Sequence, residues 1–342
     1  MRLGFSLILL LYTLLNWLVG RQILDLLKVN KIAFWVVFII LAYSPLVTRL
    51  GWVKFLNLFG NYWMVFFYYA VLVAFLGLFI KNTPFIVGCY VLIFIAIIYG
   101  VVHAKEIKLQ PYEIVIPKKA SDLHVVMLAD IHIDSAKGSN YVDKMVQDIN
   151  ALQPDLVLLA GDTFDDRDIT TLKKQKETLK AIRAKYGVYG VLGNHEYYSG
   201  NLDEMVKTFQ EANIKILRDE VVEAAGVYLV GREDAHKKTR KSLKELMHTV
   251  NLEKPIILLD HQPVTLEEAR ENGVDLQLSG HTHRGQFFPN QLITKRIYEI
   301  DYGYLAKGDL QVIVSSGYGT WGPPVRIGTQ SEIVDIKMKF TQ

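Results

Sequence analysis

Hydrophobic residues in the first third of the chain form long, nearly unbroken runs. A helix needs about 20 largely apolar residues, with a range of roughly 17–25, to cross a lipid bilayer, and three of the four runs meet this length. The second run is shorter and has Pro45 near its end, which makes it the marginal one. The runs are Leu3–Val19, Ile32–Val47, Leu58–Ile80 and Pro84–Val102. The pattern therefore predicts an all-α bundle of about four transmembrane helices within residues 1–104.

Polar residues in this region fall almost entirely between the runs. Residues 1–104 hold seven of the 38 Lys and Arg residues but only one of the 35 acidic residues, Asp25. Trp17, Trp52 and Trp63 lie near the ends of runs, as in the aromatic belts of membrane proteins. A cleaved signal peptide is the alternative for the first run, but no small-residue cleavage site follows it and further runs come after it.

The basic residues next to the runs give a weak prediction of orientation. An even number of spans places the N-terminus and the C-terminal domain on the same side of the membrane. If that side is the cytoplasm, five basic residues lie inside and four outside, which slightly favours this arrangement. The inside set is Arg2, Arg49, Lys54, Lys105 and Lys108, and the outside set is Arg21, Lys28, Lys31 and Lys81. We therefore expect a multi-pass protein of an inner or plasma membrane with a cytoplasmic C-terminal domain.

The pattern changes after residue 121, where short apolar, β-branched runs alternate with helix-like segments. This alternation predicts an α/β fold whose strands are buried on both faces. The predicted strands are Leu123–Ala129, Asp155–Ala160, Val188–Leu192, Pro255–Leu259 and Asp275–Ser279, and the predicted helices are Tyr141–Leu152, Ile169–Lys185, Leu202–Ala212 and Lys241–Thr249. The chain thus divides into a transmembrane region (1–104), a linker (105–121) in which Tyr112–Ile116 can form an edge strand, and a soluble domain (122–342).

Composition narrows the classes of partner and chemistry. Residues 105–342 hold 31 basic and 34 acidic residues, so no basic face is concentrated there and nucleic acid is not an expected partner. Cys89 is the only cysteine. The chain therefore forms no intramolecular disulfide and no thiolate metal site.

A polar cluster follows each predicted strand, at the end of the sheet where α/β folds bind ligands. Asp130 and His132 are two residues apart, as are His281 and His283, so each pair can point into one cleft. A mixture of imidazole, carboxylate and amide groups suits Mn, Fe, Co or Zn. The clusters are Asp130–His132, Gly161–Asp162, Gly193–Glu196, Asp260–Pro263 and Gly280–His283. Together they predict a metal site, with glycines that let the backbone turn closely around it.

These clusters resemble the motifs of the calcineurin-like metallophosphoesterases across residues 122–335. The matching motifs are Asp130-x-His132, Gly161-Asp162-x-x-Asp165, Gly193-Asn194-His195-Glu196, His261 and Gly280-His281-Thr-His283. The resemblance implies a four-layer αββα sandwich that holds two divalent metal ions of the Mn, Fe or Zn type. The implied ligands are Asp130, His132, Asp162 and His283 for one ion, and Asp162, Asn194, His261 and His281 for the other. Asp162 would then bridge the two ions, and His195 would be the catalytic histidine that binds neither.

Such a centre has a plain chemical use. Two metal ions can hold a phosphoryl group and activate a water molecule for in-line attack, while His195 can protonate the departing oxygen. Asp165 is expected to orient a ligand or a turn. Glu196 has two interpretations, as a residue that orients a neighbour or as one that starts a helix.

The last part of the chain points to a subgroup. The segments Gly280–Gln286 and Ser315–Gly328 resemble the membrane-associated branch of the family. That branch includes enzymes similar to UDP-2,3-diacylglucosamine hydrolases of lipid A biosynthesis and transmembrane proteins with a metallophosphoesterase domain. Arg284 departs from the glycine that is commoner at its position. Arg284 and Arg326 are candidate contacts for a substrate phosphate, with a structural role as the alternative for each.

The sequence as a whole predicts a membrane-anchored, two-metal phosphoester hydrolase, either a phosphodiesterase or a pyrophosphatase. Tethering to a bilayer favours a lipid-linked or amphiphilic substrate, such as UDP-2,3-diacylglucosamine. One alternative is a broad-specificity enzyme on soluble substrates. Another is a membrane sensor or transporter with a regulatory domain, although its spans would be expected to carry ionisable residues. A third is a binding domain without activity, although the expected ligands and His195 are all present.

Overall fold

The computed structural model describes residues 2–49, 56–135 and 137–341. Its backbone divides into two compact units. The first, called the helical unit here, contains residues 1–103 and 322–327. The second, called the sandwich unit, contains residues 104–321 and 328–342. The short segment 322–327 therefore belongs to the helical unit although it follows most of the sandwich in sequence.

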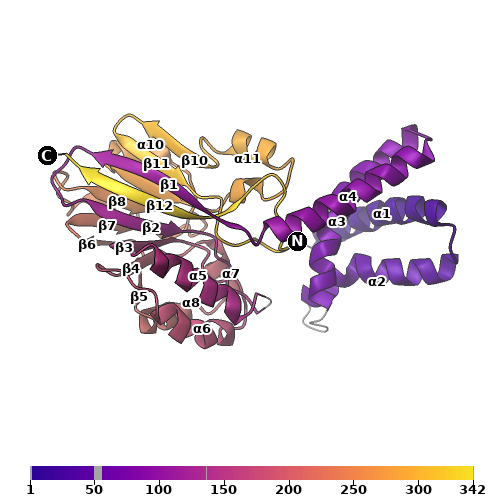
Figure 1. Ribbon diagram of the computed structural model, residues 1–342, viewed down its shortest axis with the longest axis horizontal. Coiled ribbons are helices and arrows are strands. Elements are labelled where there is room, and N and C mark those ends of the chain that lie inside the picture. The colour runs from indigo at the N-terminus through magenta and orange to yellow at the C-terminus, as the bar shows by residue number, and fades with distance from the viewer. Residues whose placement is uncertain (1, 50–55, 136, 342) are drawn as a thin grey trace. The chain divides into compact units, whose positions relative to one another are not determined.

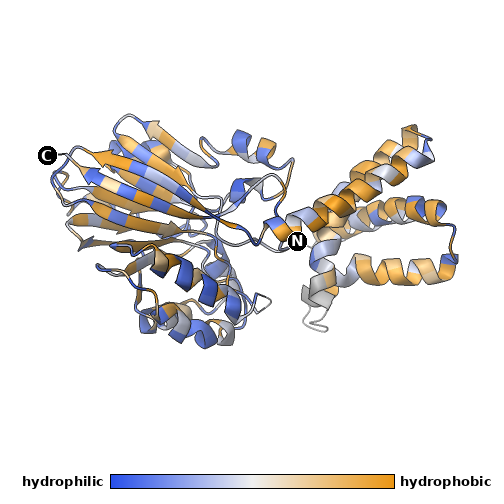
Figure 2. Ribbon diagram, in the orientation of Figure 1, coloured by the Kyte–Doolittle hydropathy of each residue, from blue (hydrophilic) through white to orange (hydrophobic). Residues whose placement is uncertain are grey.

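Four apolar helices build the helical unit. They are α1 (Arg2–Leu27), α2 (Lys31–Arg49), α3 (Leu56–Phe79) and α4 (Thr83–His103). Their shared core combines aliphatic residues with the aromatic residues Phe38, Trp63, Phe66 and Tyr90. Figure 2 shows hydrophobic residues along nearly the whole of each helix, so apolar side chains such as Leu92 also cover the outer surface, where Leu92 is 64% exposed. A surface of this kind suits a lipid environment rather than water.

Three of these helices are long and apolar enough to span a membrane. Within the described residues the spans are Gly4–Leu27, Phe59–Phe79 and Thr83–His103. The second predicted span corresponds to a shorter apolar helical stretch, Lys31–Val47, which contains Pro45. Trp52 and Lys54, which entered the predictions of interfacial position and orientation, lie outside the described residues.

Two six-stranded sheets form the centre of the sandwich unit (Figure 1). The first has the order β1-β12-β2-β3-β4-β5, and the second has the order β10-β11-β9-β8-β7-β6. Strands β2 to β5 run parallel to one another, as do β7, β8, β9 and β11. The first sheet contains β1 (Ile107–Ile116), β12 (Ser331–Phe340), β2 (Leu123–Leu128), β3 (Leu156–Ala160), β4 (Val188–Val191) and β5 (Ile214–Ile216). The second contains β10 (Gly303–Lys307), β11 (Leu310–Val314), β9 (Leu276–Ser279), β8 (Ile256–Leu259), β7 (Val227–Gly231) and β6 (Glu220–Ala224).

Alternating side chains of the strands fill different apolar layers. In β2, Val126 and Leu128 belong to the core beneath the helices α5 (Ser139–Ala151), α6 (Thr170–Lys180) and α8 (Leu202–Glu211), whereas Val125 and Met127 belong to the core between the sheets. A third core lies under α9 (Leu243–Met247) and α10 (Leu266–Glu271). This order of layers confirms the predicted αββα sandwich. It also explains why the strands are apolar at nearly every position, since both of their faces are buried.

Helices of the sandwich unit show the spacing expected for one buried face. In α5 the apolar residues Val142, Met145, Val146 and Ile149 recur at intervals of three and four residues, and all four are buried. Strand β1 occupies most of the segment 105–121 that the sequence indicates as a linker. It pairs along its full length with β12 in parallel register, from Ile107 with Ser331 to Ile116 with Phe340. That pairing involves residues far apart in sequence, which a local pattern does not reveal.

Candidate metal centre

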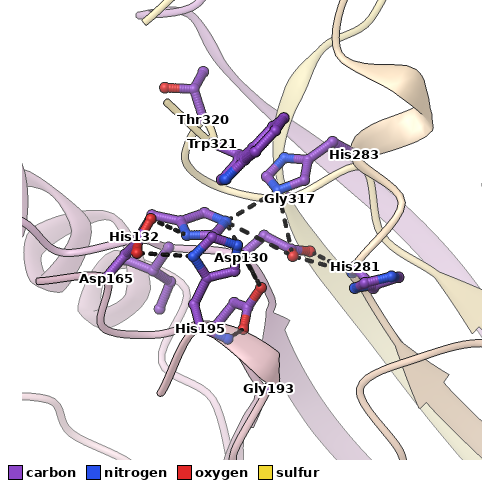
Figure 3. A network of polar contacts seen from close by, with 12 residues as sticks. Asp130, His132, Asp165, Gly193, His195, His281, His283, Gly317, Thr320 and Trp321 are labelled. Carbon is purple, nitrogen blue, oxygen red and sulfur yellow. Dashed lines mark hydrogen bonds and ion pairs between the residues drawn. The ribbon is translucent and has the colours of Figure 1, made fainter. Parts of the chain in front are cut away.

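Five loops carry candidate ligands to one end of the sandwich unit, because the parallel strands before them end there. Asp130 and His132 follow β2, Asp162 follows β3, and Asn194 begins α7 (Asn194–Ser199) shortly after β4. His261 follows β8 in the other sheet, and His281 and His283 follow β9. The two sheets therefore contribute opposite walls of a single site (Figure 3).

Side chains from different loops approach closely enough to share a metal ion. The ligand atoms of Asp130, His132 and His283 all lie within 4.8 Å of one another, and so do those of Asp162, His261 and His281. Nε2 of His132 is 3.0 Å from Nε2 of His283, which is 3.4 Å from Oδ1 of Asp130. The structure thus brings together the residue types predicted for both metal positions.

His261 provides a direct test of whether a cation fits this site. Its Nδ1 lies 2.8 Å from the carbonyl oxygen of Ala160. Because a carbonyl only accepts hydrogen bonds, Nδ1 carries the proton of a neutral ring. The other nitrogen, Nε2, is buried without a hydrogen-bond partner among the described residues and lies 3.2 Å from Oδ2 of Asp162. A lone pair that faces a carboxylate at this distance is stabilised by a cation between them, so these residues fit a metal ion.

Electrostatics lead to the same conclusion. Burial opposes a charge on His261, yet the carboxylate of Asp162 raises the pKa of His261 well above its usual value. A positive charge is therefore favoured at this position, whether a proton or a metal ion supplies it. His281 differs, because burial and the neighbouring His261 lower its pKa to about 3. A neutral imidazole is the form that binds metals, and Nδ1 of His281 lies 2.9 Å from the amide oxygen of Asn194.

The backbone around the ligands has an unusual conformation and approaches the ligand carboxylates closely. Asp130, His132 and Asp162 all have φ near +50°, in the left-handed region that non-glycine residues seldom adopt. Such residues concentrate at functional sites, where the surrounding structure holds them in place. Gly193 and Gly280 permit close approach, since a Cβ at either position would collide with the carboxylate of Asp162 or of Asp130, respectively.

Asp165 holds two imidazole rings at once (Figure 3). Its Oδ1 is 2.8 Å from Nδ1 of His195, and its Oδ2 is 3.2 Å from Nδ1 of His132. Burial works to raise the pKa of Asp165, but the two histidines hold it well below its usual range. For His195, burial works to lower the pKa, but the hydrogen bond with Asp165 and the charge of Asp162 raise it. The sequence indicates Asp165 as an orienting residue, and the structure gives it two rings to orient.

Glu196 combines both of its predicted interpretations. It is fully buried in the first turn of α7 and accepts backbone N–H groups from Gly193 at 2.7 Å, Phe164 at 2.9 Å and Asp162 at 3.2 Å. Burial, with the nearby charge of Asp162, raises the pKa of Glu196 to about 8. The side chain therefore starts the helix and fixes two ligand-bearing loops at the same time.

A Glu196→Ala variant is expected to be less stable and to bind metal more weakly. Three buried N–H groups would lose their acceptor, and each unsatisfied buried group costs about 1–3 kcal/mol. Thermal unfolding of the detergent-solubilised full chain, followed by tryptophan fluorescence, measures the first effect. Glu245→Ala is a matched control, because Glu245 makes a similar capping box with Ser242 in α9 but is exposed. Equal melting temperatures for the two variants would contradict this role of Glu196.

A cavity of about 580 Å³ opens onto the site. Asp162, Asn194, His195, His281 and His283 form its floor. The remaining lining combines apolar and polar side chains, namely Tyr198, Thr282, Gly285, Gln286, Asn290, Ile293, Thr294 and Trp321. The ring centroids of Tyr198 and Trp321 lie 5.5 Å and 6.4 Å from that of His195. The candidate proton donor is thus flanked by two aromatic rings.

Several of these lining residues carry no signal in the sequence as it stands. Tyr198 is one turn beyond Asn194 on α7, which the pattern of apolar residues does not predict. Gln286 is fixed by a contact distant in sequence, since its side chain bonds the backbone oxygen and N–H of Trp321 at 3.0 Å and 2.9 Å. Trp321 lies in the Gly-rich segment that the sequence highlights, but its position in the cavity wall depends on that contact.

The two arginines predicted as phosphate contacts have other surroundings. The guanidinium carbon of Arg284 lies 4.5 Å from the ring centroid of Tyr302, and Arg284 is not among the described residues that line the cavity. Arg326 belongs to the segment of the helical unit, where its side chain is fully buried and its backbone N–H donates to the oxygen of Gly100 at 3.0 Å. A packing role accounts for the environment of each.

Comparisons with known proteins agree with this geometry. Residues 123–285 match the family model described as calcineurin-like phosphoesterase. An uncharacterized metallophosphoesterase of Aquifex aeolicus is 31% identical over 260 residues, covering 72% of this chain and 98% of that protein. A second one, of Helicobacter pylori, is 34% identical and covers 68% of this chain and 64% of its own length. A Danio rerio transmembrane protein with metallophosphoesterase domain is 29% identical and covers 71% and 60%, respectively. The chain therefore spans somewhat less than two thirds of the Helicobacter and Danio relatives.

Proposed function

Because the chain belongs to the calcineurin-like metallophosphoesterases, metal-dependent phosphoester hydrolases with a binuclear divalent metal centre, we propose that the Asp/His cluster is its active site. The proposal assigns one metal position to Asp130, His132, Asp162 and His283, and the other to Asp162, Asn194, His261 and His281. The observation that carries it is the contact between Nε2 of His261 and Oδ2 of Asp162 at 3.2 Å. Oδ2 of Asp162 also lies 3.9 Å from Nε2 of His132, so one carboxylate reaches both groups of ligands.

The protein's own residues then divide the work of hydrolysis. When bound, two divalent ions neutralise phosphoryl charge and make a water molecule a good nucleophile near neutral pH. His195 lines the cavity beside the ligands, and its Nδ1 is held by Asp165 at 2.8 Å. Its Nε2 remains available to donate a proton to the leaving oxygen. Tyr198 and Trp321 flank that ring.

An Asp165→Asn variant is expected to shift the alkaline limb of the kcat–pH profile toward lower pH. The carboxylate of Asp165 helps to raise the pKa of His195, so a neutral asparagine lets His195 lose its proton at lower pH. The protonated acid needed by the leaving group is then lost earlier as pH rises. The check is kcat measured across pH 6–10 with saturating substrate and metal. Asp148→Asn is the control, because Asp148 is a half-buried residue of α5 that pairs with Lys144. An unchanged alkaline limb in Asp165→Asn would contradict this role of Asp165.

We assign the substrate to the class of lipid-linked or amphiphilic phosphodiesters and pyrophosphates, with a UDP-2,3-diacylglucosamine-type compound of lipid A biosynthesis as the named candidate. Three features support this assignment. The cavity walls include the apolar side chains of Tyr198, Ile293 and Trp321. Three helices suited to a membrane precede the sandwich unit. The segments Gly280–Gln286 and Ser315–Gly328 resemble the membrane-associated branch. The proposed location of the sandwich unit is the cytoplasmic side, on the weak bias of the flanking basic residues.

A substrate comparison tests this class directly. The detergent-solubilised full chain is offered UDP-2,3-diacylglucosamine, an acyl-chain-free UDP-glucosamine analogue and bis(p-nitrophenyl) phosphate, with Mn²⁺ present in each assay. The proposal expects the acylated compound to have the highest kcat/KM. Efficient hydrolysis of soluble nucleotides or phosphoproteins, with no turnover of lipid-linked compounds, would overturn the substrate class and favour a broad-specificity enzyme. That outcome would still be phosphoester hydrolysis, so it would not contradict the proposed metal centre.

A further inference from the structure

We propose that the surface around α11 (Gln291–Ile297) lies on a lipid bilayer that carries anionic headgroups. This surface is called the rim face here and consists of Leu292, Ile293, Lys295, Arg296, Ile297 and Trp321. It adds an interaction surface to the proposed hydrolase and does not depend on which phosphoester is cleaved. In Figure 1, α11 lies beyond the ends of the strands and covers the face of neither sheet.

The apolar side chains of the rim face are exposed, whereas those of a helix such as α5 are buried. In α11 the buried residue is the polar Gln291, whereas Leu292, Ile293 and Ile297 are 59%, 54% and 67% exposed. In α5, by contrast, the apolar residues are the buried ones. Single exposed apolar residues are ordinary in soluble proteins. Three in a helix of seven residues, beside a Trp321 that is 52% exposed, form a patch of the kind that marks an interaction site.

The basic residues of the rim face indicate the kind of partner that it binds. Lys295 and Arg296 are both exposed, and neither has an ion-pair partner among the described residues. The nearby carboxylate of Glu299 is already paired with Lys307, at 2.7 Å. Apolar side chains combined with unpaired basic residues are typical of elements that lie in the interface of an anionic membrane. Each basic residue adds electrostatic attraction to such a surface.

The short connection between α4 and β1 keeps a bilayer close to the sandwich unit. Helix α4, a candidate membrane span, ends at His103, and strand β1 begins at Ile107. The three residues between them extend over about 10 Å at most, so membrane is present at high effective concentration for the whole sandwich unit. A soluble protein partner has no comparable advantage. The occupant that the rim face fits is therefore a lipid surface.

The rim face is continuous with the cavity. Ile293 and Trp321 belong to the rim face and also line the cavity next to His195. A bilayer on this surface places the cavity mouth at the headgroup plane. An amphiphilic phosphoester then reaches the ligands with its apolar part still in the membrane, so its acyl chains need not be extracted into water.

Site-specific labelling of the full chain tests the proposal without reference to turnover. Cys89, the only cysteine, is replaced by alanine, and a nitrobenzoxadiazole fluorophore is attached to Leu292→Cys in reconstituted vesicles. Leu252→Cys is the matched control, since Leu252 is 51% exposed and precedes β8, so it lies at the opposite strand end from the ligands. Lipids with a spin label near the headgroup are expected to quench the label at position 292 at least about threefold more strongly than at position 252, and more so when phosphatidylglycerol is added to phosphatidylcholine. Equal quenching at the two positions would overturn the proposal.

A variant that places acidic side chains on the rim face gives a second, functional readout. Leu292 and Ile297 do not line the cavity among the described residues, so the double variant Leu292→Glu, Ile297→Glu should hydrolyse bis(p-nitrophenyl) phosphate at the unchanged rate. Its hydrolysis of a bilayer-embedded phosphodiester is expected to fall about tenfold, because two carboxylates oppose contact with lipid. Unchanged rates on the embedded substrate would contradict the proposal. If the chain hydrolyses no lipid substrate at all, the proposed substrate class fails, while the labelling result still decides the rim face.

Discussion

An Asp162→Asn variant is expected to hydrolyse bis(p-nitrophenyl) phosphate about 10³-fold more slowly than the unchanged chain. Oδ2 of Asp162 lies 3.2 Å from Nε2 of His261 and 3.9 Å from Nε2 of His132, so we expect its negative charge to serve both proposed metal positions. Asparagine keeps the size of the side chain but removes that charge. A loss of about 4 kcal/mol of transition-state stabilisation corresponds to this factor. The measurements are kcat with saturating Mn²⁺ and the number of metal ions bound per chain.

The control for this prediction is Asp148→Asn, because Asp148 forms an ion pair with Lys144 on α5 and is remote from every ligand motif in sequence. It should retain full activity and two metal ions. Asp162→Asn should bind fewer than two ions at concentrations that saturate the unchanged chain. If Asp162→Asn keeps both ions and most of its activity, Asp162 is not the bridging ligand.

Removal of the proposed proton donor should give the second large effect. We expect His195→Ala to lower kcat by about 10²–10⁴-fold on a phosphodiester with an alkyl leaving group. The loss should be much smaller for bis(p-nitrophenyl) phosphate, because p-nitrophenolate is stable without a proton and departs unaided. The measurement is therefore a pair of kcat ratios, one for each leaving group. Metal content should stay at two ions, since His195 is not a proposed ligand.

His248→Ala is the control for His195, because His248 is an exposed histidine at the end of α9 and should affect neither substrate. An equal loss on both leaving groups for His195→Ala would contradict proton donation. It would indicate instead that the ring positions the substrate or stabilises charge on phosphorus. A loss of bound metal would contradict the assignment of His195 as a residue that binds no metal.

Much of the fold and the site is readable from the sequence because the informative contacts are local. Apolar runs such as Leu123–Ala129 specify strands buried on both faces, and β2 is found there as Leu123–Leu128. Parallel strands end at one edge of a sheet, so residues that follow them are brought together without any knowledge of the contacts. The resemblance to the metallophosphoesterases implies that Asp130 and His132 share a metal with His283, which follows a strand of the other sheet. The structure places the ligand atoms of these three residues within 4.8 Å of one another.

The remaining features depend on pairs of residues that are distant in sequence. The sequence predicts an edge strand at Tyr112–Ile116, but the full extent of β1 from Ile107 is set by its pairing with β12, more than two hundred residues later. Glu196 fixes the loop of Asp162 as well as its own helix, and the apolar pattern gives no sign of this second role. Arg284 follows a ligand motif directly, yet its guanidinium packs over Tyr302, a residue 18 positions later in the chain. The sequence pattern does not predict α11, because its apolar side chains face outward and so lack the spacing of a helix with one buried face.

We propose that this chain hydrolyses phosphoesters with two metal ions held by the Asp/His cluster. The most direct test is a metal titration of the chelator-treated full chain, with bound metal and hydrolysis of bis(p-nitrophenyl) phosphate measured on the same samples. We predict no activity without metal, and activity that rises as two equivalents of Mn²⁺ bind to each chain. Hydrolysis that survives complete removal of metal would contradict the proposed two-metal site. A titration in which the Asp162→Asn variant behaves like the unchanged chain would contradict it as well.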